Sequence, residues 1–278
     1  MATIRHRKRL GRELETMRKQ RGLSQREVAS ALGWSQPTVG RIEAAKTKDV
    51  ADLVRQLLEH YEVDGPEKER LLQLAGESGP GGWWAAYNDV LPSFYAEAED
   101  EASHIRTWQE STVPGLLQTE PYSRAIIGSV ARMRGDSAEV IDRRVRARLL
   151  RRTLLERERP PRLAAVLDEA VLHRQVGGPD VMRGQLTYLA EMARRPHIDL
   201  QILPFDRGAH AGNDGRFVIL SFDDGDPDLP YVEGQAGAVY LEDPGAVDRL
   251  NLTWGCVRDA ALSVERSLDL LSRLAKET

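Results

Sequence analysis

Residues 23–43 read LSQREVASALGWSQPTVGRIE, a pattern that predicts two short helices joined by a tight turn. Ser24 and Glu27 have the spacing of a capping box, in which two residues exchange side-chain-to-backbone hydrogen bonds. Gly33 suits the left-handed backbone that often ends a helix, and Ser35 is then placed to begin the second helix. Because two helices this short cannot support each other alone, further elements must hold them.

The second of these helices carries groups that can read DNA. Val39 and Ile42 are about one turn apart and are expected to face inward. Gln36 and Arg41 then lie on the exposed side, where Gln can bond adenine and Arg can bond guanine in the major groove. The small residue Gly40 lets the helix approach the bases closely. A merely solvated polar face is the alternative, but the capping pattern and the turn glycine favour a DNA-reading helix-turn-helix.

Charge is distributed unevenly along the chain. The whole chain has a net charge of −4 at pH 7, whereas residues 1–60 contain 13 Lys and Arg against 7 Asp and Glu, a local balance of +6. A basic segment attracts phosphate and makes affinity for nucleic acid fall with added salt. A frayed, solvated basic arm is the alternative for the N-terminus. The acidic remainder argues against nonspecific coating of nucleic acid.

Length and composition indicate an ordinary globular protein of about two domains, with 278 residues of which 41% are hydrophobic. There is neither an apolar run near the roughly 20 residues of a membrane helix nor a secretory signal, so a cytoplasmic location is expected. The single cysteine, Cys256, excludes an intramolecular disulfide. Its neighbours Trp254 and Val257 predict that the thiol is packed.

Residues from about 8 to 75 resemble the lambda-repressor-like, xenobiotic-response-element family of helix-turn-helix regulators. The match runs through LSQ at 23–25, Gly33, the Ser35-Gln36 helix start and RIE at 41–43. The resemblance implies an all-α head of five helices that binds double-stranded DNA. The chain departs from common members at Pro37 and Gly40, which are often polar or charged positions, so fewer side chains are available to read bases.

The resemblance also assigns roles to individual residues. It implies phosphate contacts at helix N-termini from Gln25 and Ser35, base contacts from Gln36, Thr38 and Arg41, backbone contacts from Lys46 and Lys48, and an ion pair between Arg18 and Glu43. That ion pair ties the first helix to the recognition helix, so its implied role is architectural.

A domain boundary is predicted shortly after the DNA-binding region. Helices are expected over about 49–60 and 66–75, and a Gly- and Pro-rich stretch follows at 76–82. We therefore predict a helix-turn-helix domain over 1–77 and a signal-sensing and dimerisation domain over 78–278.

The second domain is predicted to be α+β, with helices and a small mixed or antiparallel sheet. Its pattern is helical over 83–158 and α/β over 159–278. Predicted helices lie at about 93–109, 119–131, 137–156, 179–194, 244–261 and 263–276. Predicted strands lie at 163–167, 198–203, 217–222, 230–233 and 238–241.

Several motifs stand out in this domain: GWW at 82–84, VPGLLQTE at 113–120, VGGP at 176–179 and YVE at 231–233. On these motifs the domain resembles an uncharacterised C-terminal domain that is fused to such heads in actinomycete regulators. Members are often encoded beside a small acidic protein, which implies a protein partner.

The sequence contains no recognised catalytic or metal-binding pattern. The six histidines lack metal-ligand spacing, and the chain has no phosphate-cradling Gly-x-x-x-x-Gly-Lys run or nucleophile elbow, so we predict no enzyme, no cofactor and no metal. Asp168, Glu169 and His173 could form an acid/base cluster, but a solvated turn after a strand explains them better. The acidic run 223–228 lacks the distant bidentate Glu of a calcium loop and is interpreted as a hairpin tip.

Two places could contact a ligand or a partner. One is the aromatic group Trp83, Trp84 and Tyr87, for which packing at the domain junction is the alternative. The other is the glycine-rich loop 204–215 with His210, because long loops between strands are often functional, although it could be a mere spacer.

The sequence as a whole predicts a sequence-specific transcriptional regulator that binds DNA as a homodimer. Two heads would read half-sites about 10 base pairs, or a multiple, apart. The second domain would dimerise and sense a small-molecule effector or a protein. The alternative is an antitoxin-like interaction module that binds a small acidic partner protein and autoregulates its operon.

Overall fold

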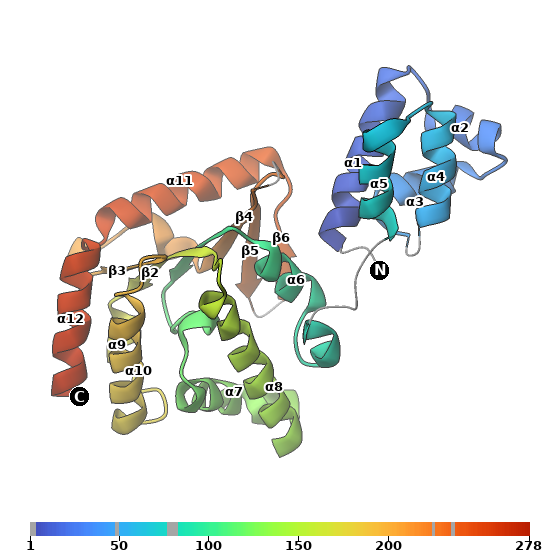
Figure 1. Cartoon of the computed structure of the whole chain (residues 1–278). Coiled ribbons are helices and arrows are strands. Elements are labelled where there is room, and N and C mark those ends of the chain that lie inside the picture. The colour runs from blue at the N-terminus through green and yellow to red at the C-terminus, as the bar shows by residue number, and fades with distance from the viewer. Residues whose placement is uncertain (1–3, 48–49, 77–82, 224–225, 235–236) are drawn as a thin grey trace. The chain divides into compact units, whose positions relative to one another are not determined.

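The computed structural model describes residues 4–47, 50–76, 83–223, 226–234 and 237–278 (Figure 1). The chain divides into two compact units, one of Met1–Ala85 with Ser93–Glu97 and one of Ala86–Pro92 with Ala98–Thr278. We call residues 4–76 the head and residues 98–278 the C-terminal region. The predicted boundary at residue 77 falls outside the described residues.

The head is all-α, as predicted. Its helices are α1 (Ile4–Gln20), α2 (Gln25–Leu32), α3 (Gln36–Glu43), α4 (Ala51–His60) and α5 (Gly65–Gly76). All five contribute to one hydrophobic core, which includes Leu14, Val28, Val39, Val54 and Leu71. Because each helix buries an apolar stripe against the others, the two short central helices gain the support that they lack alone.

The caps of α2 form as the sequence predicts. The Glu27 N–H donates to Ser24 Oγ at 3.2 Å, and the Ser24 N–H donates to Glu27 Oε2 at 2.7 Å. Gly33 ends the helix with a φ of +70°, in the left-handed region that glycine adopts without strain. These caps fix the turn from which α3 departs.

Gly11 sets how closely α1 can approach α3. A Cβ atom built at this position would lie 2.2 Å from the carbonyl oxygen of Glu43. Only a residue without a side chain therefore allows the backbones of the two helices to meet at this point.

The C-terminal region contains a six-stranded mixed sheet with the order β3-β2-β1-β4-β5-β6. The strands are β1 (His104–Gln109), β2 (Arg162–Asp168), β3 (Ile198–Leu203), β4 (Phe217–Ser221), β5 (Leu229–Gly234) and β6 (Gly237–Tyr240). β1, β2 and β3 are parallel neighbours, whereas the pairs β1–β4, β4–β5 and β5–β6 are antiparallel. The predicted α+β class is confirmed, and the sheet is of the mixed type.

The predicted helix over 93–109 is wrong in its second half. Helix α6 covers Ser93–Glu101, and strand β1 follows from His104. Ile105 and Thr107 on one face of β1 are buried, and so is Trp108 on the other. Because both faces of this central strand are covered, its hydrophobic residues do not alternate with polar ones, which removes the usual signature of a strand.

The remaining helices agree with their predicted places, except the four-residue helix α9, which lies where a turn was predicted. They are α7 (Glu120–Arg134), α8 (Ala138–Arg152), α9 (Ala170–His173), α10 (Pro179–Met192), α11 (Pro244–Ala260) and α12 (Val264–Glu277). α7 and α8 connect β1 to β2, and α12 packs against α10 and β3 (Figure 1). α11 contacts β1, β3 and β5.

The expected packing of Cys256 is wrong, because its thiol is exposed. Trp254 and Val257 are buried from the same helix, α11. Residues 254 and 257 are three apart and share the inward face of the helix, whereas position 256 lies off that face.

The loop from β3 to β4 is fixed at the carboxyl end of β1. Trp108 Nε1 donates to the carbonyl oxygen of Gly212 at 2.9 Å, and the His210 ring packs edge-on against Trp108 with 5.2 Å between centroids. A Cβ at Gly212 would lie 2.7 Å from the indole, so this contact requires glycine. The loop is therefore packed against the carboxyl end of β1.

The acidic run 223–228 lies between the antiparallel strands β4 and β5, as the interpretation as a hairpin tip predicts, and residues 224 and 225 lie outside the described part of the chain. Asp228, at the end of this connection, also has structural partners. Asp228 Oδ2 accepts hydrogen bonds from Arg106 at 2.6 Å and from Asn251 at 3.1 Å. Burial disfavours the charged form, but the hydrogen bond from Ser221 and the Arg106 guanidinium outweigh it and lower the pKa of Asp228. This carboxylate therefore connects the start of β5 with β1 and α11.

Replacing Asp228 with alanine should lower the free energy of unfolding by about 1–3 kcal/mol, because Arg106 is then left partly buried without a carboxylate. Urea denaturation at pH 7 measures the loss. Asp223→Ala, which changes an exposed carboxylate of the same run, is the matched control and should be neutral.

The same site gives a pH dependence. Because folding lowers the pKa of Asp228, its stabilising contribution is present above the ordinary Asp pKa of about 3.9 and is lost as the pH falls through the folded pKa. The stability difference between the native chain and Asp228→Asn should therefore shrink on acidification. A difference that stays constant down to pH 3 would contradict the charge assignment.

Candidate nucleic-acid interface

Helix α3 presents one buried and one exposed face. Val39 and Ile42 are buried in the core of the head, whereas Gln36 and Arg41 are exposed. Ala44, directly after the helix, is exposed too. The exposed face thus carries an amide and a guanidinium, the two groups best suited to bidentate contacts with adenine and guanine.

The start of α3 is organised by two hydroxyl groups. Ser35 occupies the N-cap position, as the sequence predicts, but its side chain does not bond the backbone. Its Oγ instead lies 2.9 Å from Thr38 Oγ1. Ser35 is exposed and Thr38 is half-buried. Because the Ser35 hydroxyl contacts Thr38 instead of the backbone, the first backbone N–H groups of α3 have no side-chain cap.

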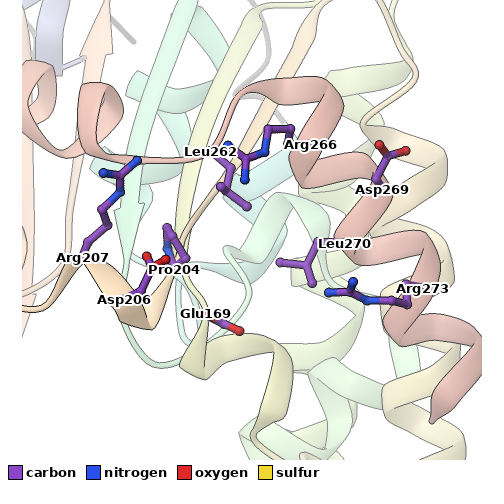
Figure 2. Close-up of a pocket in the computed structure, with 9 residues that line it drawn as sticks. All are labelled: Glu169, Pro204, Asp206, Arg207, Leu262, Arg266, Asp269, Leu270 and Arg273. Atoms are coloured by element: carbon purple, nitrogen blue, oxygen red, sulfur yellow. The ribbon is translucent and has the colours of Figure 1, made fainter.

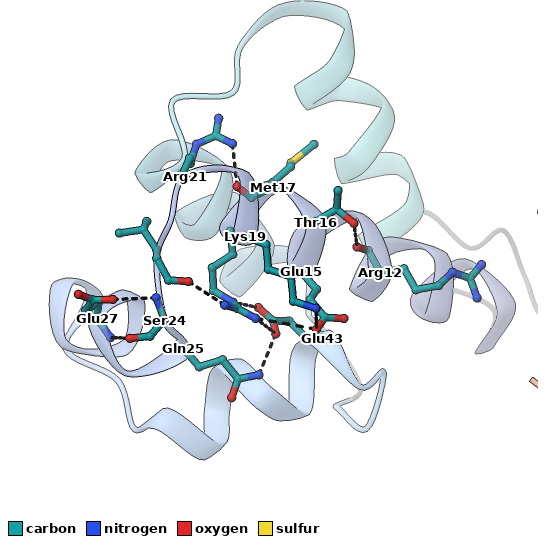
Figure 3. Close-up of polar contacts among 12 residues, drawn as sticks. Arg12, Glu15, Thr16, Met17, Lys19, Arg21, Ser24, Gln25, Glu27 and Glu43 are labelled. Atoms are coloured by element: carbon teal, nitrogen blue, oxygen red, sulfur yellow. Dashed lines mark hydrogen bonds and ion pairs between the residues drawn. The ribbon is translucent and has the colours of Figure 1, made fainter. Parts of the chain in front are cut away.

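A buried network fixes the position of α3 (Figure 3). Arg18 on α1 donates from Nε and Nη2 to the two carboxylate oxygens of Glu43, at 2.7 and 3.1 Å, and Nη1 donates to the Leu23 carbonyl at 2.7 Å. The side chains are only 8% and 5% exposed, and the hydrogen bonds to Glu43 raise the pKa of Arg18 against the effect of burial. One ion pair therefore joins α1, the start of α2 and the end of α3.

Gln25 belongs to the same network. Its Nε2 donates to Glu43 Oε2 at 2.8 Å, and Figure 3 shows the two side chains pointing toward one another. A Cβ at Gly40 would lie 3.3 Å from Gln25 Oε1, so the glycine also makes room for this amide within the head. The structure thus gives Gln25 a partner that the sequence pattern did not reveal.

Of the two lysines that follow α3, the structure describes only Lys46. Lys46 is exposed in the turn after the helix. Lys48 lies outside the described residues.

The three aromatic residues predicted for a ligand site, Trp83, Trp84 and Tyr87, lie on one short 3-10 helix, Trp83–Tyr87, and His210 lies on the loop between β3 and β4. Trp83 and Trp84 are half-buried in this helix, with their rings edge-on and 6.1 Å apart. The ring of Tyr87 lies 5.4 Å from the guanidinium carbon of Arg143 on α8. His210 accepts a hydrogen bond at Nδ1 from the Gly212 N–H, which holds the loop above Trp108.

The carboxylates that follow β2 have structural partners. Asp168 Oδ1 accepts from the Ala170 N–H, and Glu169 Oε2 accepts from the Phe205 N–H, both at 2.8 Å. His173 Nε2 lies 3.4 Å from Glu169 Oε1, and its ring stacks on Phe205. These contacts give the three residues structural partners around α9, where the sequence predicted a solvated turn.

Sequence reasoning missed a pocket of about 550 Å³ in the C-terminal region, lined by Arg207, Arg266 and Arg273 (Figure 2). Two of these arginines are seven residues apart on α12 and so share one helix face. That spacing was visible in the sequence. The opposite wall consists of Glu169, Pro204, Asp206 and Arg207, and the sequence did not show that these residues lie near α12.

The comparisons with known proteins agree with this geometry. The capped helix pair and the exposed face of α3 define a helix-turn-helix protein, and residues 9–71 match the helix-turn-helix domain family. Residues 93–273, more than half of the chain, match a domain of unknown function, DUF5753, and the chain belongs to that family. No curated protein and no solved structure matches the chain significantly. No described helix is long and apolar enough to cross a membrane.

Proposed function

We propose that this chain is a sequence-specific transcriptional regulator of the lambda-repressor-like, xenobiotic-response-element type, acting on double-stranded DNA in the cytoplasm. The observation that carries the proposal is α3, which buries Val39 and Ile42 and leaves Gln36 and Arg41 exposed. A helix supported on one side and open on the other can enter the major groove without rearrangement.

Phosphate contacts complete the proposed interface. Gln25 and Ser35, at the starts of α2 and α3, would each hold a phosphate, and Lys46 and Lys48 would contact the backbone beyond α3. Thr38 would add a base-facing hydroxyl. The basic balance of residues 1–60 supports an affinity that falls steeply with salt.

Replacing Arg41 with alanine is expected to weaken binding to the cognate operator by about 1–3 kcal/mol and to leave binding to random DNA almost unchanged. Genome-wide mapping of bound DNA identifies the operator, and fluorescence anisotropy with operator and random duplexes then measures the two affinities. Lys46→Ala is the matched control: losing a phosphate contact should weaken both duplexes equally. An equal loss for both duplexes in Arg41→Ala would contradict its base-reading role.

We also propose that residues 78–278 dimerise the chain and sense a signal. Dimerisation is supported by the geometry of such heads, which read paired half-sites. The pocket on α12 supports a small-molecule effector rather than the small acidic partner protein of an antitoxin-like module. Light scattering of the full chain measures its mass in solution, and a monomer at micromolar concentration would overturn the dimer.

A further inference from the structure

The pocket on α12 lies at the carboxyl ends of parallel strands. Glu169 follows β2 and Asp206 and Arg207 follow β3, and these residues form one wall. Leu262, just before α12, and Arg266, Asp269, Leu270 and Arg273 on α12 form the other wall, as Figure 2 shows. Crevices at the carboxyl ends of strands are where α/β sheets most often bind ligands, and about 550 Å³ is within the usual range of small-molecule sites.

The walls of the pocket are held by hydrogen bonds. The Leu262 N–H donates to the Ile202 carbonyl at 2.8 Å, and Gln201 Nε2 donates to the Leu262 carbonyl at 2.8 Å. The Ile202 N–H donates to Ser267 Oγ, a buried hydroxyl on α12, at 2.9 Å. The start of α12 is therefore fixed to β3, and the pocket is formed without a ligand.

The pocket is lined by three arginines that have no ion-pair partner among the described residues. Among the described residues, the guanidinium groups of Arg207, Arg266 and Arg273 make no ion pair and no hydrogen bond with a side chain. By contrast, Arg151 of the same region is bound to Glu99, at 2.7 and 2.8 Å. Three guanidinium groups around one pocket thus retain their full capacity to donate.

The other lining residues narrow the class of ligand. Glu169, Asp206 and Asp269 balance the three arginines, so the pocket as a whole does not favour a polyanion. Glu169 already accepts the Phe205 N–H. Leu262 and Leu270 add apolar surface for a carbon skeleton.

We propose that this pocket binds a small organic molecule with one anionic group, a carboxylate or a phosphate, which Arg266 and Arg273 of α12 hold together with Arg207. The planar guanidinium fork matches both oxyanions and forms charge-assisted hydrogen bonds with them. The inference deepens the proposed sensing role by naming its effector class.

Isothermal titration calorimetry of the full chain tests the proposal, with inorganic phosphate and butyrate as separate probes at constant ionic strength. At least one probe should bind saturably, and Arg266→Gln and Arg273→Gln should each weaken it about tenfold or more, as expected for a lost hydrogen bond to a charged group. Arg258→Gln on α11, outside the pocket, is the matched control and should bind like the native chain. Circular dichroism checks that each variant is folded.

Each outcome decides the proposal. Binding of phosphate alone or of butyrate alone supports it and identifies the anionic group. Failure of both probes overturns it, and so does binding that the two pocket variants and the control share equally. Because the titration contains no DNA, its failure leaves the DNA-binding proposal intact, and a failure to bind any duplex leaves the pocket result unaffected.

Discussion

Replacing Gly11 with alanine is expected to unfold the head. The added Cβ would lie 2.2 Å from the carbonyl oxygen of Glu43 and 2.9 Å from its carbonyl carbon. Both atoms belong to the backbone of α3, so no flexible side chain can move aside, and α1 must separate from α3. Overpacking of a core typically costs about 1–3 kcal/mol, and a backbone clash this close should reach at least about 3 kcal/mol. The better helix propensity of alanine offsets only about 1 kcal/mol.

Hydrogen exchange of the full chain measures this effect separately in the two parts of the chain. Amides of α1–α5 should lose protection in Gly11→Ala, while amides of the sheet keep theirs. Gly128→Ala on α7 and Gly184→Ala on α10 are controls, because a Cβ at either helical position meets nothing within 4 Å. Each should stabilise by about 0.5–1 kcal/mol. Native-like protection of the head in Gly11→Ala would refute the close helix contact.

Replacing Arg18 with methionine should destabilise the head by about 3–5 kcal/mol. The change removes every donor that Arg18 gives to Glu43 and to the Leu23 carbonyl, and it leaves a carboxylate that is only 5% exposed without its cation. Gln25 still donates to Glu43, but one amide cannot replace a bidentate guanidinium. The loss should exceed that of any exposed ion pair, such as Arg55 with Asp52.

A double-mutant cycle separates the ion pair from the cost of an unpaired charge. Arg18→Met with Glu43→Leu should recover much of the stability that Arg18→Met loses, because no buried charge then remains. Urea denaturation followed by circular dichroism supplies the four free energies of unfolding. If the double variant were as unstable as the sum of the two single variants, the residues would be uncoupled, and the pair could not be what positions α3.

The head could be predicted well because its signals are local. The capping box at Ser24, the turn glycine at position 33 and the inward stripe of Val39 and Ile42 all act within one or two helical turns. The role of Gly11 could not be predicted in this way. Its requirement comes from Glu43, a residue on another helix, and appears only when the two backbones are brought together.

The C-terminal region was less predictable because its decisive contacts are distant in sequence. Hydrophobic and polar residues do not alternate in β1, because both of its faces are covered. The helix predicted over 93–109 was therefore extended into this strand. The partners of Asp228 could not be predicted, because Arg106 lies on β1, far from it in the sequence. The arginines of the pocket were hidden for the same reason: Arg207 meets the face of α12 only after β3 and α12 have packed together.

The central position of β1 has a consequence for synthesis on the ribosome. β1 pairs with β2 on one side and with β4 on the other, so its second edge stays open until residues 217–221 have left the exit tunnel. The core of the head lies within residues 10–75, so the head can fold long before that. Translation therefore passes through a stage in which a finished N-terminal domain is attached to an incomplete sheet, and the nascent chain is then most vulnerable to aggregation and most dependent on chaperones.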